Sequence, residues 1–216
     1  MSRKFAGKFI TFEGGEGVGK STNIQWCADQ LNEQGIEVVV TREPGGTPIA
    51  ELIRNKLLKA HHPEPMTPMA ELLLMFAARN QHLEQVIIPA LERGAWVLCD
   101  RFTDSTIAYQ GFGRGLDLSA IEQLKSLAQG DVEPDCTFLL DAPVEVGMAR
   151  ARGRSETTGE ATDRFETEAL AFFERVKDGF HSLAAMHSRF VIVDATQTLD
   201  DVQTELSVRL SMLKGD

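Results

Sequence analysis

Several residue types that define whole classes of protein are scarce in this chain. Its three cysteines, Cys27, Cys99 and Cys136, are odd in number and lack CxxC spacing, which argues against a disulfide framework and favours reduced core thiols. Lys and Arg number 22 against 32 Asp and Glu, and the resulting net charge of −10 argues against nucleic-acid binding. No apolar run approaches about 18 residues, and no apolar signal region precedes the first strand. We therefore expect a cytoplasmic protein that does not enter membranes.

The length and bulk composition fit one globular domain. The 216 residues, 43% hydrophobic and 25% charged, can bury one sizeable core. The only break in composition is the polar, glycine-flanked segment 153–162, GRSETTGEAT. We predict a single domain, 1–216, with a short mobile lid at about 150–164. The paired His61 and His62 lie in a proline-rich loop without a third ligand nearby, so solvated side chains are the favoured interpretation there.

Short apolar segments alternate with amphipathic ones along the chain. This order predicts an α/β fold in which a parallel sheet is covered by helices on both faces. Two successive helices are expected at 69–80 and 82–93. The strands are predicted at 8–12, 36–40, 95–99, 137–140 and 190–193. Since ligands bind at the carboxyl ends of parallel strands, the loops that should form the site are 14–21, 42–46, 100–106, 141–144 and 194–197.

The segment 14–21, GGEGVGKS, matches the phosphate-loop pattern G-x-x-x-x-G-K-[ST] and lies between a predicted strand and a predicted helix. Glycines let successive N–H groups surround phosphate oxygens, and the helix N-terminus adds a positive dipole end. Lys20 can reach the β- and γ-phosphates, and Ser21 can ligate Mg²⁺. The sequence thus predicts ATP binding by Gly14, Gly15, Glu16, Gly17, Val18, Gly19, Lys20, Ser21 and Thr22.

Other parts of the chain indicate what happens to the γ-phosphate. The guanine-reading N-K-x-D and the D-x-x-G switch of GTPases do not occur. Four arginines lie within fifteen residues around the predicted lid: Arg150, Arg152, Arg154 and Arg164. Contacts with a transferring phosphoryl group explain this cluster in an acidic protein. The alternative is a solvated helix face paired with nearby glutamates.

The run VLCDRFTDSTIAYQ at 97–110 resembles the signature of thymidylate kinases. FEGGEGVGKST, TREPGGT, YQGFGRG and DRFE also resemble that family, in order and spacing, over about residues 8–195. The resemblance implies a P-loop nucleoside monophosphate kinase fold with a five-stranded parallel sheet. It also implies transfer of the ATP γ-phosphate to dTMP, giving dTDP for dTTP synthesis, with Mg²⁺ and as a homodimer.

The resemblance also assigns roles to individual residues. Lys20, Arg101, Arg150 and Arg154 are implied to stabilise the charge that moves during transfer. Ser21 and Asp100 are implied to hold Mg²⁺, with an ion-paired structural aspartate as the alternative for Asp100. Tyr109 is implied to exclude ribonucleotides, against the alternative of a core tyrosine. The dTMP site is implied to contain Glu16, Arg54, Phe76, Arg79, Arg101, Ser105, Thr106, Tyr109 and Gln110.

The chain departs from the family pattern at one place and falls into one of its subtypes. The family stacks thymine on a phenylalanine four residues before the base-reading arginine, but Met75 holds that place and Phe76 lies three before Arg79. Either residue can contact the ring. Positions 15–18 hold no arginine, which indicates the type with its arginine in the lid. Two alternatives stay open: a kinase for another nucleoside monophosphate, and an inert nucleotide-binding protein on the same fold.

Overall fold

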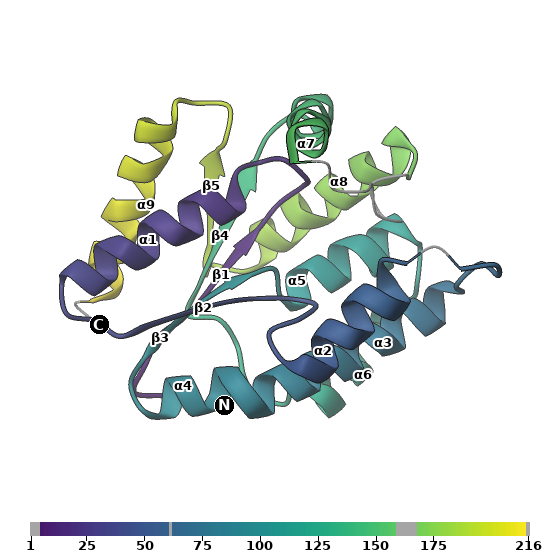
Figure 1. The fold of residues 1–216 in the computed structure, drawn as a ribbon, viewed down its shortest axis with the longest axis horizontal. Coiled ribbons are helices and arrows are strands. Elements are labelled where there is room, and N and C mark those ends of the chain that lie inside the picture. Colours follow the sequence, from purple (N-terminus) through teal and green to yellow (C-terminus); the bar gives the residue numbers. More distant parts are fainter. Residues whose placement is uncertain (1–4, 61, 159–167, 215–216) are drawn as a thin grey trace.

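The computed structural model describes residues 5–60, 62–158 and 168–214, and for 154–158 it describes the backbone alone. Within them, five parallel strands form one sheet in the order β2-β3-β1-β4-β5 (Figure 1). The central strand β1 aligns Phe12 with Asp100 of β3 and with Phe138 of β4. The strands are β1 (Phe9–Glu13), β2 (Val38–Arg42), β3 (Trp96–Asp100), β4 (Cys136–Asp141) and β5 (Phe190–Asp194).

Helices pack on both faces of the sheet because each central strand alternates its apolar side chains between them. Ile10 and Phe12 contact the cluster formed with α1 and α9, whereas Phe9 faces the cluster below α4. The helices are α1 (Lys20–Glu33), α2 (Pro48–Leu52), α3 (Pro68–His82), α4 (Ile88–Glu92), α5 (Thr103–Thr106), α6 (Leu118–Ala128), α7 (Val144–Thr158), α8 (Leu170–Met186) and α9 (Leu199–Leu213). Three π-helical segments extend them: η1 (Ile53–Leu58), η2 (Leu83–Ile87) and η3 (Ile107–Gly113).

The predicted strands are confirmed, with ends displaced by up to two residues. The prediction of separate helices at 69–80 and 82–93 was wrong, because α3, η2 and α4 run on without a break. No glycine or proline interrupts 81–82, and the π-helical turn ends two residues before Pro89, which cannot donate a helical hydrogen bond. β2 and β5 are partly exposed because they lie at the two edges of the sheet.

Other sequence predictions have mixed outcomes. All three cysteines are free and buried, as expected. The backbone of α7 is helical to Thr158, so the first part of the predicted lid segment is helix, while 159–167 lie outside the described residues. His61 also lies outside them, and exposed His62 contacts the Leu57 carbonyl at 2.9 Å. Across the described ranges, no group of three or more His, Cys, Asp or Glu is arranged to hold a metal, and no helix has the length and apolarity to cross a membrane.

Candidate active site

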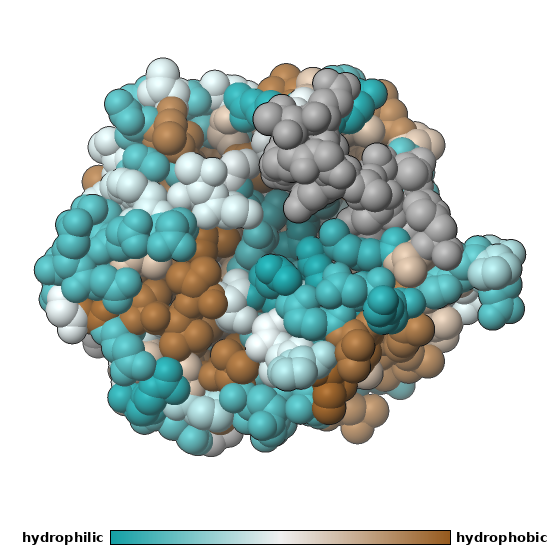
Figure 2. Space-filling model, viewed as in Figure 1, coloured by the Kyte–Doolittle hydropathy of each residue, from teal (hydrophilic) through white to brown (hydrophobic). Residues whose placement is uncertain are grey.

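A cavity of about 610 Å³ lies at the carboxyl ends of β1, β2 and β3. Its wall joins the phosphate loop, the turn after β2 and the segment that follows β3, which are three of the five loops predicted to form the site. Hydrophilic side chains dominate the part of the surface above these strand ends (Figure 2). The residues that line it include Glu16–Thr22, Arg42–Pro44, Arg54, Lys59, Met75, Arg79, Asp100–Phe102, Ser105, Thr106, Tyr109 and Gln110.

The phosphate loop connects β1 to the first turn of α1. Gly17 and Gly19 have φ values of 69° and 89°, which only glycine adopts without strain. Lys20 is buried, and its Nζ donates to the carbonyls of Gly15 at 2.7 Å and Gly14 at 3.3 Å. Burial and the neighbouring Arg101 guanidinium lower the pKa of Lys20 to about 8. The lysine is therefore held across the loop, beside the N–H groups that begin a fourteen-residue helix.

Arg101 lies where the segment after β3 meets this loop. Its backbone has φ of 67°, a conformation that costs a non-glycine residue about 1 kcal/mol. Two hydrogen bonds fix that turn. The Arg101 N–H donates to Phe12 O, and the Phe102 N–H donates to Glu13 Oε1 at 2.8 Å. The strained turn aims the guanidinium at the loop, where Nη1 donates to Gly14 O at 2.8 Å.

Two side chains on this side of the cavity donate hydrogen bonds to Glu16. Arg101 Nη2 donates to its Oε1 at 2.7 Å, and the Tyr109 hydroxyl donates to the same oxygen at 3.0 Å. Burial opposes the charge on Glu16, but Arg101, Lys20 and the tyrosine hydrogen bond outweigh it and lower the pKa to about 2. Burial first, and then the adjacent carboxylate, raise the pKa of Tyr109. The result is a fixed anion beside a neutral phenol.

Ser21 and Asp100 come together at the other side of the loop. Ser21 Oγ lies 3.5 Å from Asp100 Oδ2, and Asp100 Oδ1 is buried with no hydrogen-bond partner among the described residues. A buried carboxylate oxygen without a partner is costly unless a ligand completes it. A hydroxyl and a carboxylate oxygen are the donors that Mg²⁺ prefers, so the residues present fit this ion.

The far end of the cavity is built around Arg79, which is buried. Its Nε donates to Glu43 Oε2 at 2.7 Å and its Nη2 donates to Thr106 Oγ1 at 2.8 Å. Met75 lines the cavity, whereas Phe76 packs in a buried cluster with Leu72 and Ile121. Phe76 still contacts the arginine, because the guanidinium carbon lies 4.9 Å from its ring centroid. Of the two candidates for stacking on the base, Met75 thus forms the wall and Phe76 supports Arg79.

Three further residues assigned to the dTMP site have partners within the protein. Ser105 Oγ donates to Glu13 Oε2 at 2.5 Å and receives Arg101 Nη1 at 3.2 Å. Gln110 Nε2 donates to Glu71 Oε1 at 2.7 Å. Arg54 Nη1 donates to the Pro44 carbonyl at 2.9 Å. All three of the assigned residues line the cavity.

The two described arginines of the predicted lid, Arg150 and Arg152, are not among the residues that line the cavity. Arg150 is exposed, and its Nη1 donates to the Ala195 carbonyl after β5 at 2.8 Å, away from the residues that line the cavity. Arg152 is exposed and contacts the Met148 carbonyl of its own helix. The side chain of Arg154, and all of Arg164, lie outside the described residues. The structure therefore does not bring a described lid arginine to the phosphate loop.

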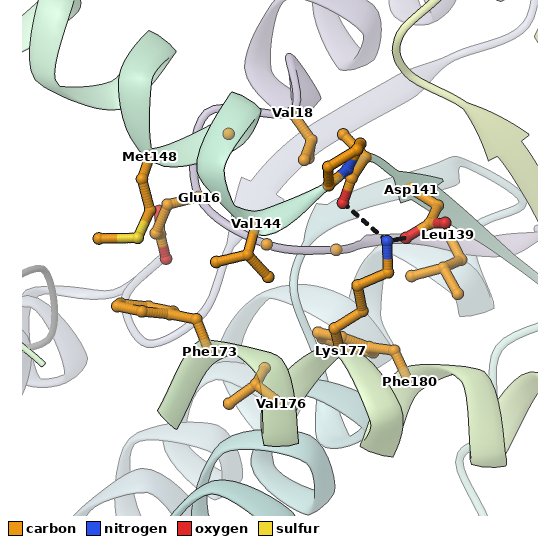
Figure 3. A pocket seen from close by; sticks show the side chains of 15 residues that line it. Glu16, Val18, Leu139, Asp141, Val144, Met148, Phe173, Val176, Lys177 and Phe180 are labelled. Carbon is orange, nitrogen blue, oxygen red and sulfur yellow. Dashed lines mark hydrogen bonds and ion pairs between the residues drawn. The ribbon is translucent and has the colours of Figure 1, made fainter. Parts of the chain in front are cut away.

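A smaller cavity of about 30 Å³ is lined by the phosphate loop, α7 and α8 (Figure 3). Lys177 closes one end by donating to the Ala142 carbonyl at 3.0 Å and pairing with Asp141 at 3.2 Å. Beside it α7 touches the loop directly, since a Cβ on Gly147 would lie 2.3 Å from the Glu16 carbonyl oxygen. The start of α7, the helix that carries the first part of the predicted lid, is thus in backbone contact with the phosphate loop.

Comparisons with known proteins agree with this geometry. The family model for thymidylate kinase matches residues 12–206. The chain belongs to the thymidylate kinase family. This confirms the family resemblance, the P-loop α/β fold and the assignment to the nucleoside monophosphate kinases.

Individual relatives cover nearly the whole chain. The thymidylate kinase of Chromohalobacter salexigens is 54% identical over 206 residues, which is 95% of each protein. That of Pseudomonas fluorescens is 55% identical over 208 residues, or 96% of each. The crystal structure of the thymidylate kinase from Ehrlichia chaffeensis is 37% identical, has a TM-score of 0.75 and covers 94% of this chain and 98% of its own.

Sequence reasoning missed the buried carboxylates that support the candidate site. Glu13, Glu43 and Glu71 are each less than 5% exposed and hold Ser105, Arg79 and Gln110 respectively. His82 lies against Glu43, and its Nδ1–H donates to Glu43 Oε1 at 3.0 Å. For Glu13 and Glu71 the available signal was a glutamate inside an apolar strand or helix face, because such a side chain is rarely buried without a partner.

Proposed function

We propose that this chain transfers the γ-phosphoryl group of ATP to dTMP, giving dTDP for dTTP synthesis. The observation that carries the proposal is the meeting of two cations at one loop: Lys20 Nζ and Arg101 Nη1 both donate to the Gly14 carbonyl. Lys20 belongs to the donor side and Arg101 to the acceptor side. The hydrogen bonds of Lys20 and Arg101 to one carbonyl thus connect the proposed donor side and acceptor side of the cavity.

The chemistry requires that arrangement. The acceptor phosphate is a dianion and ATP carries several negative charges, so the two repel until cations lie between them. Lys20 and Arg101, together with Arg54 in the same wall, supply this charge. A phosphate oxygen is already the nucleophile, so no general base is required. Catalysis then consists of positioning and charge stabilisation.

We propose that the site also binds Mg²⁺. Ser21 and Asp100 would hold Mg²⁺ on the phosphate chain, and the ion would neutralise charge on the β- and γ-oxygens. Asp100 then positions an ion and removes no proton. The unpartnered Oδ1 of Asp100 supports this assignment.

The lid arginines complete the proposed site. Arg150 and Arg154 lie on α7, which contacts the phosphate loop through Gly147. For Arg150 to reach a transferring phosphoryl group, it must release the Ala195 carbonyl. We propose that nucleotide binding provides the anion that draws it away.

We also propose a homodimer. Apolar side chains on α2, α3 and α6, which pack side by side, are exposed to water: Leu52 is 59% exposed, Leu73 49% and Leu127 83%. Brown patches mark hydrophobic residues over this part of the molecule in Figure 2. Light scattering on the purified chain should give twice the 23.8 kDa chain mass, and Leu73→Glu should shift it toward the monomer.

Cytoplasmic location stays a prediction.

A coupled ADP-release assay with dTMP, dUMP, UMP, AMP and GMP as acceptors tests the proposed reaction. We expect dTMP to give the highest kcat/KM, and UMP to be poor because Tyr109 blocks a 2′-hydroxyl. Turnover with AMP or GMP but not dTMP would establish the alternative, a kinase for another nucleoside monophosphate. ATP binding without turnover of any acceptor would establish the inert nucleotide-binding protein.

A further inference from the structure

The side-chain amide of Gln110 is held from behind by a buried carboxylate. Gln110 and Glu71 are each 1% exposed, and Gln110 Nε2 donates to Glu71 Oε1 at 2.7 Å. Glu71 lies on α3 and Gln110 on η3, so the contact joins two elements on one wall of the cavity.

Glu71 can only accept in this arrangement. Arg114 donates to both of its oxygens, Nε to Oε1 and Nη2 to Oε2, each at 3.3 Å. Arg114 is itself fixed, with its guanidinium carbon 4.7 Å from the Phe172 ring centroid and Nη1 on Glu168. A carboxylate offers no proton, so the amide nitrogen of Gln110 must face it. The amide oxygen of Gln110 is thereby directed away from Glu71. Gln110 itself is one of the residues that line the cavity.

A donor lies on the same wall. Arg79 uses Nε on Glu43 and Nη2 on Thr106, and its Nη1 is buried with no partner in the described part of the chain. Thr106 lies one helical turn before Gln110, which places the two cavity-lining groups next to each other. The same wall therefore carries an acceptor that Glu71 does not occupy, Gln110 Oε1, and a donor without a described partner, Arg79 Nη1.

We propose that Glu71 is the residue that sets base specificity, by fixing the Gln110 amide with its oxygen toward the acceptor base. The inference rests on the proposed function. Thymine and uracil present an N3–H donor beside a carbonyl oxygen, which matches this acceptor and donor. Cytosine presents an N3 acceptor beside an amino donor, so both contacts are mismatched. A site that leaves buried polar groups unpaired rejects the wrong ligand strongly.

The substitution Glu71→Gln tests this role. An amide at position 71 can donate as well as accept. The side-chain amide of Gln110 can then rotate by half a turn and present its NH₂ to N3 of cytosine. One of the two mismatches with cytosine is then removed. We expect the dCMP-to-dTMP ratio of kcat/KM to rise about tenfold. The dUMP-to-dTMP ratio should not change, because uracil and thymine share the same hydrogen-bonding edge.

Further variants separate this role from a structural one. Glu71→Met, an unbranched side chain without an acceptor, should raise the dCMP-to-dTMP ratio in the same direction and serves if Glu71→Gln does not fold. Glu71→Asp keeps a carboxylate and should keep the wild-type ratio even if its overall rate falls. Glu168→Gln makes the same chemical change on the other partner of Arg114 and should also keep it.

Two outcomes oppose the inference, and they are distinguishable from failure of the proposed function. If the variants lower kcat/KM for dTMP, dUMP and dCMP by one common factor, Glu71 is structural and the inference is wrong. An increase of the ratio in Glu168→Gln equal to that in Glu71→Gln also contradicts it. The absence of dTMP turnover in the wild-type protein would instead reject the proposed function.

Discussion

Arg101 and Glu16 form an ion pair across the mouth of the phosphate loop, with Nη2 2.7 Å from Oε1. The pair joins a residue inside the donor-binding loop to one on the acceptor side, and Tyr109 donates to the same carboxylate oxygen. The motif pattern leaves position 16 unspecified. In the folded chain this residue fixes the guanidinium on which the proposed transfer depends.

We predict that Glu16→Gln lowers kcat/KM for dTMP by about 10- to 100-fold, because a neutral amide loses the charge-assisted bond to Arg101. The KM for ATP should change little, since the loop backbone is kept. With a pKa near 2, Glu16 stays ionised from pH 5 to pH 9, so the deficit should be constant over that range. Steady-state kinetics at several pH values measure it. A deficit that disappears at one end of the range contradicts the assignment.

The raised pKa of Glu13 predicts that the stability of the fold depends on pH. Burial, with Asp104 adding to it, raises its pKa from 4.5 to about 8, so the folded state keeps a proton that the unfolded state releases. The stability this proton contributes is fully present below pH 4.5 and is lost as the pH rises through 8. Glu13→Gln cannot release the proton, so its melting temperature should fall less than that of the wild type between pH 5 and pH 8. Glu122→Gln, on exposed α6 surface, is the control and should keep the wild-type slope.

The close contact of Gly147 with the phosphate loop predicts that a single added methyl group slows the reaction. A Cβ there would lie 2.3 Å from the Glu16 carbonyl oxygen, so Gly147→Ala must displace α7 from the phosphate loop. We expect kcat to fall about tenfold or more, because a displacement on the order of 1 Å is costly in a preorganised site. Gly153→Ala adds the same methyl on the same helix, where no described atom outside the neighbouring helical backbone lies within 4 Å of the new carbon, and its kcat should match the wild type. Equal rates for the two variants would show that the contact with the loop does not matter.

Asp100 predicts the response to magnesium. Asp100→Asn keeps the shape of the side chain but removes the negative charge opposite Ser21, so the Mg²⁺ concentration for half-maximal activity should rise about tenfold. Melting temperature should change little, because Oδ1 has no partner in the described structure to lose. A normal magnesium response with a lower kcat would move Asp100 out of the proposed ion site.

The fold and the donor half of the site could be predicted because their signals are local. The loop 14–21 carries its pattern in eight consecutive residues, and β1 and β3 are short apolar runs. The acceptor half depends on contacts between distant positions, such as Glu71 with Gln110 and Glu43 with Arg79. No periodicity marks such pairs. The choice between Met75 and Phe76 is of the same kind, because both lie on one face of α3 and packing against Ile121 decides which is buried.

Direct detection of the product tests the central claim. The wild-type chain, Lys20→Ala and Arg101→Ala would each be incubated with Mg²⁺, dTMP and ATP labelled at the γ-phosphorus, and the nucleotides separated. We predict labelled dTDP from the wild type, and about 100- to 1,000-fold slower formation by both variants, because each lacks one of the cations that meet at Gly14. Label in inorganic phosphate alone, or undiminished dTDP formation by Lys20→Ala, would contradict it.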